Sequence, residues 1–152
     1  MDTKHVVSLE LARQLKEAGF PQVSEFYWIL CDEFDAKIVT KDGPIDELCE
    51  DSEFSYDPPS VKYDLLEDEK NGDLSDDIKI YSAYFASELG EWLNKIGADL
   101  FIKAYGEVFN FKGTGSVGLL GVINLIRLPD MSAKMLLYLA KEGLINPKEL
   151  KV

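Results

Sequence analysis

The chain has 152 residues, enough for one domain, and its 46% hydrophobic and 11% aromatic residues are typical of a globular protein rather than a disordered acidic tail. Its net charge of −12 argues against direct nucleic-acid binding, because phosphate contacts need clustered Lys and Arg. Cys31 and Cys49 have no partner at metal-ligand spacing, and the sequence shows no signal peptide or long apolar span. We therefore expect a cytoplasmic protein without a membrane segment, a cofactor or a metal.

The first 40 residues predict a helix followed by a hairpin. Apolar residues repeat at helical spacing over 9–18, behind Ser8 as the N-cap. The aromatic and β-branched run 26–31 favours a strand, and 36–40 is expected to pair with it as a hairpin.

The segment 45–77 loses this periodicity. Pro58-Pro59, Asn71-Gly72 and many acids predict an irregular, acidic insert within the domain. Apolar residues such as Phe54 and Val61 indicate that part of the insert packs on the body of the protein.

Order returns at 78–81, before a helix over 85–96 with one continuous apolar stripe. We expect two strands next, over 100–105 and 108–111, joined near Gly106.

The apolar segment 119–128 fits either a strand or a short buried helix. Pro129-Asp130 then opens a last helix that runs to Glu142, with Gly143 as its C′ residue. Together the elements predict a single α+β domain over 1–152, with about three helices packed on a small, mainly antiparallel sheet.

The negative charge is concentrated in the middle of the chain. Residues 32–77 contain 17 acids and 4 bases, whereas the rest contains 11 acids and 12 bases. Such a surface complements a basic protein, including one that itself binds nucleic acid. The predicted partner-binding residues are Asp46, Glu47, Glu50, Asp51, Glu53, Glu67, Asp68, Glu69, Asp73, Asp76 and Asp77.

Residues 113–118, Gly-Thr-Gly-Ser-Val-Gly, match the GxGxxG pattern of dinucleotide-binding loops. That fold needs a crossover helix, a second strand and an acid about 20 residues further on. Pro129 arrives after 11 residues, which leaves too little chain. A glycine-rich hairpin or connecting loop is the favoured interpretation, with nucleotide binding as the alternative.

Residues 67–78 partly match a calcium loop, with acids at positions 1 and 3, Asn at 5 and Gly at 6. Position 12 should be a bidentate Glu, and here it is Ile78. A solvated acidic turn at Asn71-Gly72 is therefore favoured over a cation site at 67–77.

Catalytic groups are scarce. His5 is the sole histidine, which removes most triads and histidine acid–base chemistry, and no GxSxG elbow occurs. We predict that the protein is not an enzyme.

Three segments in matching order resemble a group of small uncharacterised proteins of bacteriophages and prophages. They are 8–20 (SLELARQLKEAGF), 86–93 (ASELGEWL) and 133–139 (AKMLLYL). In that group the link between the first hairpin and the central helix is shorter, so the acidic insert 42–77 is a departure. The resemblance implies no activity and no catalytic residues.

These observations predict a non-enzymatic, phage-type accessory protein that binds a host or phage protein through its acidic surface. One version is an inhibitor whose carboxylates imitate a phosphate backbone. The alternatives are a small-molecule or cation-binding protein that uses 113–118 or 67–77, and a structural or assembly component.

Overall fold

The computed structural model describes residues 3–31, 34–45, 60–108 and 128–150. From the N-terminus, the elements are η1 (Thr3–His5), α1 (Leu9–Glu17), β1 (Phe26–Cys31), β2 (Phe34–Thr40), η3 (Val61–Leu65), α2 (Leu66–Asn71), β3 (Ile78–Ser82), α3 (Ala86–Ile96), α4 (Ala98–Val108), α6 (Pro129–Lys141) and η4 (Pro147–Glu149). The predicted α+β class and single small domain are confirmed. The described part of the chain holds five α-helices, against about three expected.

The sheet has three antiparallel strands in the order β2-β1-β3. The predicted hairpin is confirmed, and β2 begins at Phe34, two residues before the expected start. Tyr27 of the central strand pairs with Val39 on one side and with Ser82 on the other. The regular structure expected at 78–81 is the edge strand β3.

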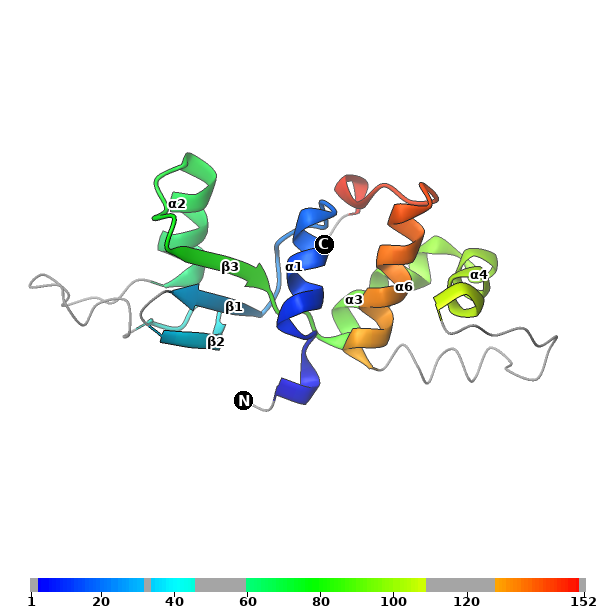
Figure 1. The fold of residues 1–152 in the computed structure, drawn as a ribbon, viewed down its shortest axis with the longest axis horizontal. Helices are drawn as coiled ribbons and strands as arrows, with labels where there is room; N and C mark the ends of the chain where they lie inside the picture. The colour runs from blue at the N-terminus through cyan, green and yellow to red at the C-terminus, as the bar shows by residue number, and fades with distance from the viewer. Residues whose placement is uncertain (1–2, 32–33, 46–59, 109–127, 151–152) are drawn as a thin grey trace, which may run out of the picture.

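Buried side chains form two hydrophobic clusters. The larger lies among α1, α3, α4 and α6 and includes Leu15, Leu93 and Leu136. The smaller covers one face of the sheet and consists of Tyr27, Ile29, Ile45, Val61, Leu65 and Ile80. In Figure 1 the sheet and α2 occupy one end of the molecule and α3, α4 and α6 the other. The helix α1 lies between them and contacts both α6 and β3.

The helices expected over 9–18, 85–96 and 130–142 are confirmed to within one residue at each end. Their packing explains the agreement, since each buries one apolar face. Gly143 follows α6 with φ +72°, the left-handed conformation expected of a C′ glycine.

The strand predicted over 100–105 is wrong, because these residues belong to α4. Aromatic and β-branched residues favoured a strand locally, but Ala104 is buried and Leu100 and Tyr105 pack on the helical cluster. Leu100 and Ala104 are four residues apart and so share a face of a helix. Packing against α6 therefore overrides the local preference. Val108 ends α4, so the second predicted strand does not begin there; the rest of that strand, 109–111, lies outside the described residues.

Residues 60–77 contain more regular structure than expected. The backbone N–H of Leu65 donates to Ser60 O at 3.2 Å, which closes the π-helical turn η3. The helix α2 follows directly and ends at Asn71, and its C-cap Gly72 has φ +78°. The predicted turn at Asn71-Gly72 is thus the C-terminal end of a short helix. Residues 46–59 and 119–127, on which other expectations fall, lie outside the described part of the chain.

Candidate functional site

The acidic face is the part of the predicted partner surface that the structure describes. It consists of α2 and the connection from α2 to β3 and contains Glu67, Asp68, Glu69, Asp73, Asp76 and Asp77. The other predicted residues, Asp46, Glu47, Glu50, Asp51 and Glu53, lie outside the described residues. The structure therefore brings six of the eleven candidates together on one short element and its loop.

The acids of this face are largely unpaired. Glu67, Asp73, Asp76 and Asp77 are exposed, and within the described residues they form no ion pair. Glu69 is the exception: Lys16 Nζ lies 2.8 Å from one of its carboxylate oxygens and 2.9 Å from the other. The same ammonium group donates to Ile80 O at 2.8 Å. Lys16 thus joins the acidic face to α1.

An exposed aromatic residue, which the sequence led us to count among the packing residues of the insert, precedes the acidic helix. Tyr63 is 67% exposed and lies on η3, next to Asp64. The ammonium of Lys62 lies 5.4 Å from the centroid of its ring. A large exposed aromatic residue beside acids is a common anchor of a protein interface.

The alternative cation loop at 67–77 has a different geometry from a calcium loop. Its first five positions, 67–71, lie within α2, where side chains point away from the helix axis rather than toward a common centre. No group of three His, Cys, Asp or Glu suited to a metal ion occurs among the residues that the structure describes. The glycine-rich segment 113–118 lies outside those residues.

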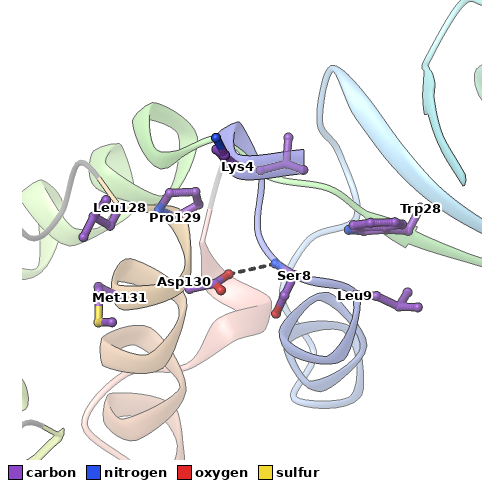
Figure 2. Close-up of a pocket in the computed structure, with 9 residues that line it drawn as sticks. Lys4, Ser8, Leu9, Trp28, Leu128, Pro129, Asp130 and Met131 are labelled. Carbon is purple, nitrogen blue, oxygen red and sulfur yellow. Dashed lines mark hydrogen bonds between the residues drawn. The ribbon is translucent and has the colours of Figure 1, made fainter. Parts of the chain in front are cut away.

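A hollow of about 500 Å³ lies where the N-termini of α1 and α6 meet (Figure 2). Its lining is mostly apolar, with Trp28 on one side and Leu128 and Pro129 on the other. The carboxylate of Asp130 also lines the hollow, and its Oδ1 accepts a hydrogen bond from the Ser8 backbone N–H at 2.8 Å. The Trp28 indole N–H donates to Val7 O at 2.9 Å. The polar groups at this hollow thus tie elements of the fold together.

A second hollow, of about 280 Å³, lies between the connection before β1, the turn η3 and α3. It is bordered by the charged residues Glu25, Lys41, Lys62 and Glu88 and the apolar Val23 and Leu66. Burial raises the pKa of the Glu88 carboxyl above its ordinary value. The hydrogen bonds that the carboxylate accepts from two backbone N–H groups lower the pKa and so oppose this effect. Its mixture of charged and apolar groups distinguishes this hollow from the apolar one in Figure 2.

None of the described helices is both long enough and apolar enough to cross a membrane. No protein family model, curated protein or solved structure matches the chain.

Proposed function

We propose that the protein is a non-enzymatic, phage-type accessory protein that acts in the cytoplasm and binds a basic host or phage protein through its acidic face. The observation that carries this proposal is the exposure of Glu67, Asp73, Asp76 and Asp77 on α2 and the connection to β3, where they form no ion pair with any residue that the structure describes. The resemblance to phage and prophage proteins supports the accessory role.

Physical chemistry favours a protein partner over a passive acidic surface. Unpaired carboxylates of one sign create a field that speeds association with a positively charged surface. Tyr63 adds an apolar contact that charge alone does not supply. A partner that itself binds nucleic acid offers a matching basic groove, in which the carboxylates would take the place of phosphates.

The test is a pull-down from host lysate at low and moderate salt with wild type and two variants. One variant carries Glu67→Gln, Asp73→Asn, Asp76→Asn and Asp77→Asn. The control removes the same number of charges from exposed acids elsewhere, with Glu91→Gln, Glu107→Gln, Glu142→Gln and Glu149→Gln. We expect a basic protein that the wild type and the control retain, that the first variant loses and that added salt releases.

A single uncharged substitution tests the aromatic contact. Because Tyr63 is exposed, Tyr63→Ala is expected to leave the unfolding midpoint nearly unchanged. Truncation of an interface anchor costs about 2 kcal/mol or more, so affinity for the captured partner should fall roughly 30-fold or more. Capture of no basic protein, or equal capture by both charge variants, would contradict the proposal.

A further inference from the structure

We propose that the hollow between the connection before β1, η3 and α3 binds a free amino acid with an apolar side chain. In this arrangement Glu88 receives the ammonium group, Lys62 the carboxylate, and Val23 and Leu66 the side chain. The inference does not rest on the acidic face, because neither Glu88 nor Lys62 belongs to it.

Hydrogen bonds between distant segments build the cationic side of this hollow. The Lys62 backbone N–H donates to Lys41 O at 2.9 Å, which places the two lysines side by side. The Lys41 ammonium lies 2.9 Å from Glu25 Oε1, so its charge is compensated. Lys62 forms no ion pair within the described residues, and its ammonium lies 5.4 Å from the centroid of the Tyr63 ring. Among the described residues that line the hollow, Lys62 is therefore the cation without a carboxylate partner.

Glu88 supplies the uncompensated negative charge. Its Oε2 accepts the Phe85 backbone N–H at 2.7 Å, and its Oε1 accepts the Glu25 backbone N–H at 3.3 Å. Two carboxylate oxygens offer about four acceptor positions, so capacity for a donor remains. Within the described residues no cation pairs with Glu88. A half-buried carboxylate of this kind gains from an ammonium group that enters the hollow.

The remaining groups define the size and polarity of the ligand. The hydroxyl of Tyr27 accepts the Ser24 N–H at 3.2 Å and donates to Gln22 O at 3.1 Å, so its hydrogen bonds are already made. Val23 is 54% exposed and Leu66 is half-buried, which leaves apolar surface to cover. A volume of about 280 Å³ is just below the roughly 300–1,000 Å³ of sites for drug-sized ligands.

One ligand class satisfies both charges. A simple anion would compensate Lys62 and leave Glu88 unpaired, and a simple amine would do the reverse. An amino acid carries both groups on one carbon atom and an apolar side chain beside them. The π-helical turn that presents Lys62 is a rare element that occurs frequently at functional sites.

The experiment is isothermal titration calorimetry, in which the protein is titrated with L-leucine, L-methionine, L-phenylalanine and two analogues of leucine. L-leucinamide lacks the carboxylate, and N-acetyl-L-leucine lacks the ammonium group. We expect at least one of the three amino acids to bind. Loss of one charged contact is expected to weaken binding about tenfold or more, so each analogue of leucine should bind at least that much more weakly than leucine itself.

Two variants assign the charges. Glu88→Gln should lower the affinity for leucine about tenfold and leave the affinity for N-acetyl-L-leucine unchanged. Lys62→Gln should also lower the affinity for leucine about tenfold, but leave the affinity for L-leucinamide unchanged. Gln at position 88 can still accept the Phe85 N–H in the capping box of α3, so the variant is expected to fold. Glu107→Gln on α4 and Lys70→Gln on α2, both at exposed positions, are the controls and should bind as wild type does.

Failure of all three amino acids to bind at about 10 mM, a concentration that detects millimolar affinity, would overturn the inference. Equal binding of leucine and both analogues would also overturn it, because the charged groups would then play no part. Neither result would affect the pull-down, which depends on different residues.

Discussion

Asp130 in the first turn of α6 holds the N-terminus of α1: its Oδ1 accepts the backbone N–H of Ser8 at 2.8 Å, although 122 residues separate the two. Ser8 occupies the N-cap position of α1 as predicted, but its side chain makes no capping hydrogen bond. We expected Asp130 to open α6, and it does so while satisfying a donor of another helix. One carboxylate thus lies near two helix N-termini, where negative charge is favourable.

We therefore expect Asp130→Ala to lower the free energy of unfolding by about 1.5–3 kcal/mol, the contribution of a hydrogen bond to a charged group. Asp130→Asn keeps an acceptor oxygen and loses only the charge, so it should cost about 0.3–1 kcal/mol. Urea denaturation of both variants measures the two costs. Equal stability of the Ala variant and the wild type would show that this hydrogen bond contributes nothing.

Gly97 connects α3 to α4 with φ +103° and ψ 151°, a conformation that is almost restricted to glycine. A Cβ at this position would meet no atom within 4 Å, so any cost of Gly97→Ala comes from the backbone. We expect a loss of about 1–3 kcal/mol of stability, measured by urea denaturation.

Gly90 in the interior of α3 is the matched control for that change. Its added Cβ would also meet nothing within 4 Å, but its backbone is helical. Gly90→Ala should therefore raise stability by about 0.5–1 kcal/mol. The same sign of effect at both glycines would contradict this account.

Lys16 connects α1 to Glu69 of the acidic face and to Ile80 O of β3, and its ammonium lies 5.4 Å from the centroid of the Tyr81 ring. Lys16→Met keeps the aliphatic part of the side chain and removes these polar contacts. Because both partners of the ion pair are partly exposed, with 27% and 33% of their side chains accessible, we expect a cost of about 1 kcal/mol.

A double-mutant cycle of Lys16→Met and Glu69→Gln isolates the pair, and its coupling should decrease as salt increases. Lys134→Met, at an exposed position on α6, is the control and should change stability by less than about 0.5 kcal/mol. A coupling energy of zero at low salt would exclude a contribution of this link to stability.

The pKa of Glu88 predicts a pH dependence. Burial raises it above the ordinary value of 4.5, so the folded protein keeps this proton to a higher pH than the unfolded chain does. The resulting contribution to stability is complete below the unfolded pKa and is lost as pH rises through the folded pKa. Glu88→Gln cannot titrate, and its stability relative to wild type should rise with pH across this window and level off above it. A constant difference at every pH, measured by urea denaturation, would contradict the assignment.

Much of the fold follows from periodicity. The apolar stripe of α3 and the aromatic and β-branched run of β1 specify their elements locally, and both were predicted within one residue. The helix α4 was predicted as strand because Leu100 and Ala104 show their helical relation only against α6. The helix α2 buries no residue, so it has no apolar face for a sequence pattern to reveal.

The sites were less predictable than the fold. The acids of α2 could be predicted as part of a charged surface from composition, because the segment contains so many of them. Glu88 and Lys62 are 26 residues apart and form no sequence motif. They line the same hollow because of the Lys62–Lys41 backbone hydrogen bond and the position of α3. Tyr63 could have been noticed as an aromatic residue between charged neighbours, but its exposure depends on the π-helical turn.

The packing of α1 on α6 has a consequence for how the chain assembles during translation. The sheet and α2 come from residues within 26–82, so this half of the molecule leaves the ribosome complete and early. The helix α1 is made first, but α6 follows only after more than 100 further residues, or roughly 10 s at ordinary rates of synthesis. Throughout that interval the apolar face of α1, with Leu11 and Leu15, lacks the α6 side of its final surroundings. The N-terminal helix is therefore expected to be the last part of the nascent chain to become resistant to proteases.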